Sequence, residues 1–170
     1  MTVVFYISAA IAILATILTI TRLNPVHALL YLVISLLAVA IVFFTLGAPF
    51  VAALEVIIYA GAIMVLFIFV VMMLNLGGPT VALERRWVYP GMWIGPTILA
   101  AILVAEVIVL LMDGSAARLV GAEVAPKQVA LALYQPYLIG VELASFLLMA
   151  GVVGAYHLGA RRGAQQDAVR

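Results

Sequence analysis

The sequence contains no cysteine and few charged residues, and both absences exclude classes of protein. Without a thiol the chain has no disulfide, no thiolate zinc site and no cysteine-ligated iron–sulfur cluster of its own. Only 9% of its 170 residues are charged, with a formal net charge of +1, so no basic field is available for a nucleic acid. There is no glycine-rich phosphate loop, no nucleophile–base constellation and no histidine with a partner at metal-ligand spacing. We therefore expect no cofactor, no metal and no catalytic residue in this chain.

What the chain has instead is apolar surface. Its hydrophobic fraction is 68%, whereas a soluble domain has about 45–50%. Lipid must cover such a surface, and a span of the hydrocarbon core takes about 20 apolar residues. We predict an all-α integral membrane protein with five transmembrane helices, at residues 2–21, 25–46, 51–76, 92–112 and 136–158. These form a single transmembrane domain over residues 1–160, with an outer loop at 113–135 and a polar tail at 161–170.

The basic residues predict the orientation. Two of the eight, Arg118 and Lys127, lie in the long loop, and the other six lie on the opposite side of the membrane. The positive-inside rule places the six in the cytoplasm. The N-terminus is then outside and the C-terminus in the cytoplasm. Within the long loop, Lys127 to Leu133 is a candidate short surface helix.

The third predicted span contains an acid and a phenol. Glu55 and Tyr59 are four residues apart and so share one face of a helix. A carboxyl group inside a membrane span is costly unless it is paired, hydrated or protonated. One interpretation is that both side chains reach the outer headgroups. The other is that they form part of a proton relay.

Three small residues, Ala60, Gly61 and Ala62, follow directly. Small residues let another membrane helix approach closely, which favours a packing role. The alternative is that Gly61 marks a weak point where the helix holds a π-bulge, a feature often found at functional sites. If such a bulge formed and relaxed, Val65 and Phe67 would rotate with it.

Two further acids lie inside predicted spans. Glu142 is close enough to the start of the fifth span to reach the outer interface, in a structural or a relay role. Glu106 lies deeper, two turns before Asp113. We expect it to pair with a partner subunit or to open toward the outer surface.

Three stretches together resemble a known family. They are the run from Glu55 to Leu76 with its Tyr59-Ala-Gly-Ala motif, the turn Asn24-Pro25-Val-His-Ala-Leu, and Val141-Glu142-Leu-Ala-Ser in the last helix. With the five spans, they resemble the J-subunit family of bacterial NADH–quinone oxidoreductase, respiratory complex I, which is similar to subunit 6 of the mitochondrial enzyme. Glu106 and the sequence of the long loop are not part of the family pattern.

The resemblance implies a membrane-arm subunit of the bacterial inner membrane. Its neighbours would be the A, K and H subunits and the antiporter-like subunits, while FMN, iron–sulfur clusters and quinone belong to the parent complex. It further implies a π-bulge near Gly61 that relaxes to regular helix and gates a hydrated path from quinone reduction to proton translocation. The proton-path or gating residues would be Glu55, Tyr59, Gly61, Val65, Phe67 and Glu142. The alternatives are a small homo-oligomeric transporter or channel, and a purely scaffolding membrane subunit.

Overall fold

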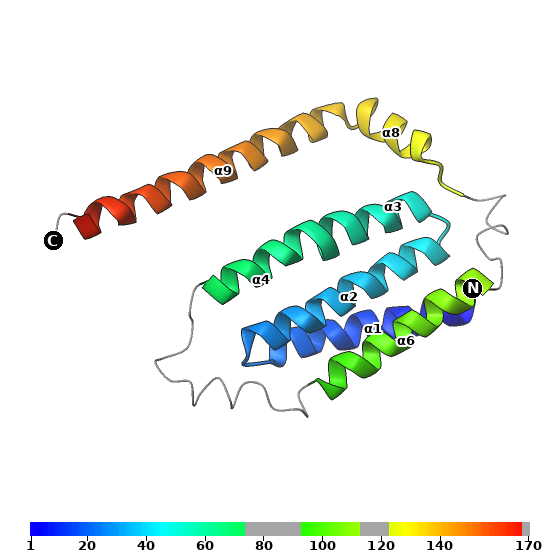
Figure 1. The fold of residues 1–170 in the computed structure, drawn as a ribbon. Helices are drawn as coiled ribbons and strands as arrows, with labels where there is room; N and C mark the ends of the chain where they lie inside the picture. Colours follow the sequence, from blue (N-terminus) through cyan, green and yellow to red (C-terminus); the bar gives the residue numbers. More distant parts are fainter. Residues whose placement is uncertain (74–92, 113–122, 168–170) are drawn as a thin grey trace. The chain divides into compact units, whose positions relative to one another are not determined.

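In the computed structural model, residues 1–73, 93–112 and 123–167 are described, and every regular element within them is a helix. Five helical stretches in these ranges are long and apolar enough to cross a membrane: Thr2–Thr21, Pro25–Thr45, Pro49–Val71, Ile94–Met112 and Leu138–Gly159. The prediction of an all-α protein with five membrane helices is therefore confirmed (Figure 1). The predicted bounds at residues 74–76 and 92 lie outside the described residues.

The first two helices, α1 (Thr2–Thr21) and α2 (Pro25–Thr45), form an antiparallel pair. The reversal between them depends on Asn24, whose side-chain oxygen accepts hydrogen bonds from the backbone N–H groups of Val26 (2.9 Å) and His27 (3.4 Å). Pro25 occupies the first turn, where a helix needs no N–H donor. The Asn-Pro sequence thus caps α2 and turns the chain back along α1.

Small and polar residues hold α1 and α2 together. Ala15 and Ala38 are fully buried, which allows the two backbones to approach closely. Beside them, the hydroxyl oxygens of Thr16 and Ser35 lie 2.8 Å apart, and the Ser35 hydroxyl donates to the carbonyl of Ala12 at 3.1 Å. In a bilayer no water competes for these groups, so the network fixes the register of the two helices.

We expect Thr16→Val to weaken this pair. The substitution keeps the branched shape and removes the hydroxyl that meets Ser35, which costs about 0.6 kcal/mol and at most about 1.7 kcal/mol for a bond between membrane helices. Thr19→Val is the matched control, because among the described residues the Thr19 hydroxyl bonds only to Ala15 of its own helix. Thermal unfolding in mild detergent measures both variants. Equal midpoints for the two would contradict a role of the network in joining the helices.

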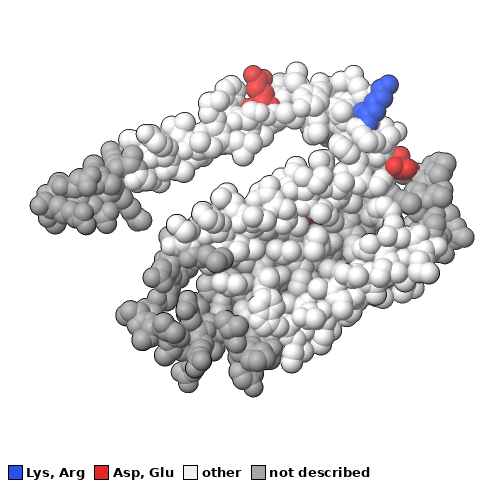
Figure 2. Space-filling model, in the orientation of Figure 1, with Lys and Arg blue, Asp and Glu red and all other residues white. Residues whose placement is uncertain are grey.

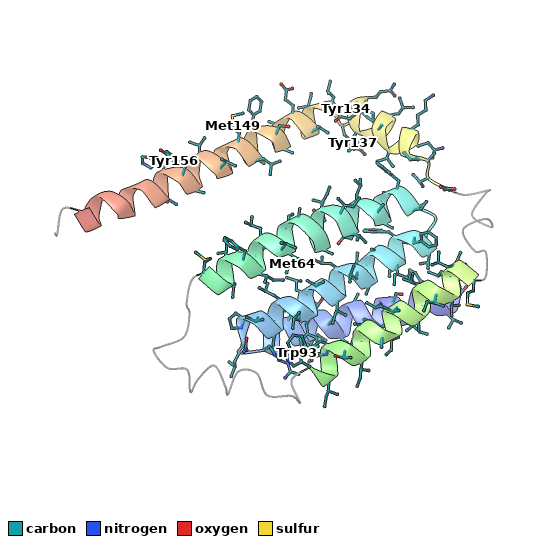
Figure 3. The ribbon with its side chains drawn as sticks, viewed as in Figure 1. Met64, Trp93, Tyr134, Tyr137, Met149 and Tyr156 are labelled. Atoms are coloured by element: carbon teal, nitrogen blue, oxygen red, sulfur yellow. The ribbon has the colours of Figure 1, made fainter. Side chains whose placement is uncertain are left out.

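The third membrane helix is continuous but changes its hydrogen-bonding pattern. It begins as α3 (Pro49–Leu54), continues as the π-helix η1 (Glu55–Ile63) and ends as α4 (Met64–Met73). Gly47, at a positive φ of 83°, makes the turn from α2, and such a φ strains any residue with a Cβ. This third membrane helix packs against α2, and Met64 is 2% exposed on the side that faces α2 (Figure 3).

Helix α6 (Ile94–Met112) packs against α2 and α1. Its buried face contains Leu103, Glu106 and Leu110, spaced three and four residues apart as one helix face requires. The core shared by α1, α2 and α6 consists of Ile11, Ala15, Ile34, Ala38, Ile41, Leu103 and Leu110. One ionisable side chain of the described residues, Glu106, is thus buried beside this apolar core.

The described residues divide into two compact units, Met1–Val124 and Ala125–Arg170. The second contains α8 (Pro126–Tyr134) and α9 (Leu138–Asp167), so the short helix expected in the long loop is confirmed. Helix α9 continues to Asp167, so residues 161–167 of the predicted polar tail are helical, and the tail itself stays a prediction. The sequence becomes polar after Gly159, but the backbone hydrogen bonds of a helix form equally well between polar residues. The single domain over residues 1–160 stays a prediction.

Apolar side chains dominate the surface of both units. Figure 2 shows few charged side chains on the face in view. In α9 the described side chains from Glu142 to Gly159 are all exposed, although most are apolar. Hydrocarbon or other membrane helices must therefore cover these surfaces.

Candidate functional site

The residues predicted to form a proton path cluster on the third membrane helix. Glu55, Tyr59 and Gly61 lie within η1, and Val65 and Phe67 follow in α4. The π-helix therefore lies over the stretch where the sequence predicted a bulge, and it is longer than a single turn, with nine residues. At its end the N–H of Met64 donates to the carbonyl of Tyr59, the i→i−5 bond that defines this helix type. Relaxation of this segment to α-helix stays a prediction.

The predicted residues of the third membrane helix lie on its side away from α2 and from the core of the first unit. Glu55 is half-buried, while Tyr59 is 50%, Val65 63% and Phe67 53% exposed. Among the described residues no hydrogen bond joins Glu55 to Tyr59, although both lie on the same rod. Within the first unit the described residues thus leave the acid, the phenol and the two apolar residues uncovered.

Gly61 has a specific steric reason to be glycine. A Cβ placed on it would lie 3.1 Å from the carbonyl oxygen of Val56, closer than most Cβ atoms approach any neighbour. Val56 is five residues earlier, so its carbonyl is the one that the π pattern brings beneath residue 61. A side chain at residue 61 would therefore crowd the backbone of the π-helix, whereas glycine does not.

Glu142, the remaining predicted site residue, is exposed on α9 in the second compact unit. Apolar side chains surround it on the exposed surface of α9. Its membership of a proton path with Glu55 stays a prediction.

The structure also reveals a pair that sequence reasoning missed. The hydroxyl of Ser8 in α1 donates to Oε2 of Glu106 in α6 at 2.7 Å, across 98 positions of sequence. Glu106 is only 6% exposed, so the expectation that it opens toward the outer surface is wrong. Within the sequence the one available signal was a serine in the middle of an apolar α1, which is too common a feature to single out a partner.

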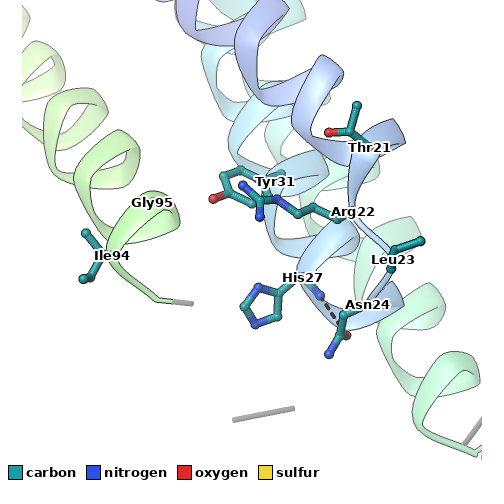
Figure 4. A pocket seen from close by; sticks show the side chains of 8 residues that line it. All are labelled: Thr21, Arg22, Leu23, Asn24, His27, Tyr31, Ile94 and Gly95. Atoms are coloured by element: carbon teal, nitrogen blue, oxygen red, sulfur yellow. Dashed lines mark hydrogen bonds between the residues drawn. The ribbon is translucent and has the colours of Figure 1, made fainter. Parts of the chain in front are cut away.

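A polar pocket of about 520 Å³ lies between the α1–α2 turn and the start of α6 (Figure 4). The guanidinium carbon of Arg22 is 5.4 Å from the centre of the Tyr31 ring, a cation–π contact. The rings of His27 and Trp93 lie 6.4 Å apart, edge to face. Within the described ranges no three histidines or acids come together as metal ligands. The side chains of Arg22, His27 and Tyr31 on its walls thus lie between the start of α2 and the start of α6.

A second cavity, of about 530 Å³, is almost entirely apolar and lies between α2, the third membrane helix and α6. Its lining includes Ile34, Ala52, Val56, Leu103 and Val107. A surface of this kind accepts hydrocarbon and offers no polar group to orient a hydrophilic solute. It gives no support to a transporter.

Known proteins resemble this chain over almost its whole length. The model of the family described as NADH-ubiquinone/plastoquinone oxidoreductase chain 6 matches residues 15–158. NADH-quinone oxidoreductase subunit J of Pseudomonas aeruginosa is 57% identical over 163 residues, 95% of this chain and 98% of that protein. The subunit J of Escherichia coli is 56% identical over 155 residues, covering 91% of this chain and 84% of that protein. The subunit J of Buchnera aphidicola from Schizaphis graminum is 44% identical over 156 residues, with 92% and 96% covered.

Proposed function

Because this chain belongs to the NADH-ubiquinone/plastoquinone oxidoreductase chain 6 family and is a membrane subunit of respiratory complex I, we propose that it couples quinone reduction to proton translocation through a switch in its third membrane helix. The resemblance to the J-subunit family is thereby confirmed. The coupling itself is our inference from the geometry of η1.

The observation that supports this proposal is the π-helix Glu55–Ile63 in the middle of a membrane rod. Conversion from i→i+5 to i→i+4 bonding changes the register by one residue, which rotates the following segment by about 100°. Helix α4 carries Val65 and Phe67 on its exposed side, so both would swing through that angle. A side chain as large as Phe67 then opens or closes a hydrated path next to it.

In this proposal Glu55 and Tyr59 exchange protons with water along that path, and Gly61 permits the change of backbone. A protonatable acid inside a bilayer is a functional group by default. Glu142, from the second unit, joins the path in the assembled complex. Electron transfer through FMN, iron–sulfur clusters and quinone takes place in other chains.

The exposed apolar sides of η1, α4 and α9 support a place among other membrane subunits, which we propose to be the A, K, H and antiporter-like subunits. We further propose that the complex lies in the bacterial inner membrane with the C-terminus of this chain in the cytoplasm. The asymmetry of the basic residues supports that orientation.

The proposal is tested by Glu55→Gln combined with Tyr59→Phe in the intact complex. Both substitutions keep the shape of the side chain and remove a proton-exchanging group. We expect fewer protons pumped per NADH oxidised in proteoliposomes, with normal amounts of assembled complex. Tyr156→Phe is the control, because it removes an exposed phenol from α9 outside the proposed path. A wild-type ratio of protons to NADH in the double variant would favour a purely scaffolding subunit.

A further inference from the structure

Glu106 is the most unusual residue of the first unit. It lies within the membrane helix α6, is 6% exposed, and accepts a hydrogen bond at 2.7 Å from Ser8, which is fully buried in α1. Its other oxygen, Oε1, is buried and has no hydrogen-bond partner among the described residues. Buried polar atoms in proteins are almost always satisfied, so an unpartnered carboxyl oxygen requires an explanation.

No described cation faces this carboxyl group. Helix α6 packs against α1 and α2, whose titratable groups, with those of the residues flanking α1, are the Met1 amine, Tyr6, Arg22, His27 and Tyr31. Met1 is seven residues from Ser8, about 10 Å along α1, and the Tyr6 side chain is 67% exposed. His27 and Tyr31 lie beside the start of α6, where the nearest α6 residue is eleven positions from Glu106, about 16 Å. Arg22 lines the pocket at the start of α6 together with His27 and Tyr31, at the same distance from Glu106 along the helix.

These contacts favour the neutral form of Glu106. A buried carboxylate without a cation is expensive, whereas a carboxylic acid needs only an acceptor for its O–H. Because the Ser8 hydroxyl already donates to Oε2, the proton of the acid belongs on Oε1. A water molecule that accepts from Oε1 would complete the hydrogen bonds of the site.

We propose that Glu106, held in place by Ser8, is a second proton-holding site within the membrane, with the proton on Oε1 and a water molecule as its exchange partner. On release the O–H bond of the acid breaks and the proton passes to that water. The Ser8 hydrogen bond then stabilises the carboxylate until a proton returns. This site is separate from η1 and needs no backbone switch. It rests on the proposed function only in that the chain works within a proton-pumping complex.

The test is infrared difference spectroscopy of the intact complex, recorded on reduction by NADH. A site that exchanges its proton during turnover gives a carboxylic-acid C=O band that shifts in D₂O. We expect Glu106→Gln, which preserves an acceptor for Ser8, to remove that band and to lower the number of protons pumped per NADH. Glu123→Gln, at an exposed acid outside the helices, should change neither. Absence of the band in the wild type, or its persistence in Glu106→Gln, would overturn the proposal.

A second variant covers the case in which Glu106→Gln fails to assemble. Ser8→Ala removes the only hydrogen bond that the described residues make to this acid, so the frequency of its band must shift. An unshifted band in Ser8→Ala would contradict the assignment. The two proposals can fail separately. Normal pumping in the Glu55 and Tyr59 double variant would refute the proton path along η1, but it would not affect the infrared band assigned to Glu106.

Discussion

Gly61→Val should abolish most proton pumping by the assembled complex. The Cβ of residue 61 would lie 3.1 Å from the Val56 carbonyl, and valine adds two methyl groups to that atom. Crowding of a packed site costs about 1–3 kcal/mol. A cost of that size shifts a two-state equilibrium by about 5–150-fold, here away from the π-helix. If η1 is held in the α-helical form, it cannot convert between the two forms. In our proposal proton pumping depends on that conversion, so pumping should be lost.

Proteoliposomes with a pH-sensitive dye measure this effect, and a structure of the variant shows the backbone of η1. Gly61→Ala should have a smaller effect in the same direction, because it adds one carbon. Gly154→Val in α9 is the matched control, since a Cβ on Gly154 meets no described atom of its own unit within 4 Å beyond the adjoining helix backbone. A Gly61→Val complex that pumps normally, with its π-helix intact, would refute both the steric argument and the switch.

Gly95→Ala should destabilise the packing of α6 against α2. A Cβ on Gly95 would overlap the Tyr31 hydroxyl and lie 3.3 Å from the ring carbon that carries it. The ring of Tyr31 is 3% exposed and lies beneath Arg22, so it has little freedom to move aside (Figure 4). Overpacking of this kind costs about 1–3 kcal/mol. We expect a lower unfolding midpoint in detergent and less chain assembled in membranes.

A second substitution makes the prediction specific. Tyr31→Phe removes the atom with which the new methyl group collides, so Gly95→Ala with Tyr31→Phe should recover much of the lost stability. Gly140→Ala serves as the control, because a Cβ there meets no described atom of the second unit within 4 Å beyond its neighbours in the helix. Equal losses in the single and the double variant would show that the hydroxyl is not the source of the strain.

Much of the architecture was predictable because it depends on local sequence. In a bilayer each helix satisfies its own backbone hydrogen bonds, so length and hydropathy alone identify the spans. The span predicted at residues 2–21 agrees with α1 at both ends. The start of the second span at residue 25 and the short helix near Lys127 were also predicted correctly, since caps and short helices depend on neighbouring residues.

The candidate site was predictable only in part. The sequence placed Glu55, Tyr59 and Gly61 on one membrane helix, and the family resemblance predicted a π-bulge near Gly61. It did not reveal which side of the rod faces α2, because the rotation of a helix depends on the neighbours with which it packs. The exposure of Tyr59 and Phe67, and the burial of Met64, therefore came from the tertiary structure.

By itself, then, the sequence determined the membrane class, the five spans and the family, all of which follow from hydropathy and motifs within short stretches. Only the tertiary structure decided that Ser8 bonds to Glu106, and that the Val56 carbonyl lies under Gly61. The first contact joins residues 98 positions apart, and the second depends on a hydrogen-bonding pattern that differs from the regular α-helix by one residue. Packing between helices sets the first contact and the backbone of η1 sets the second, and a pattern of residue types contains neither.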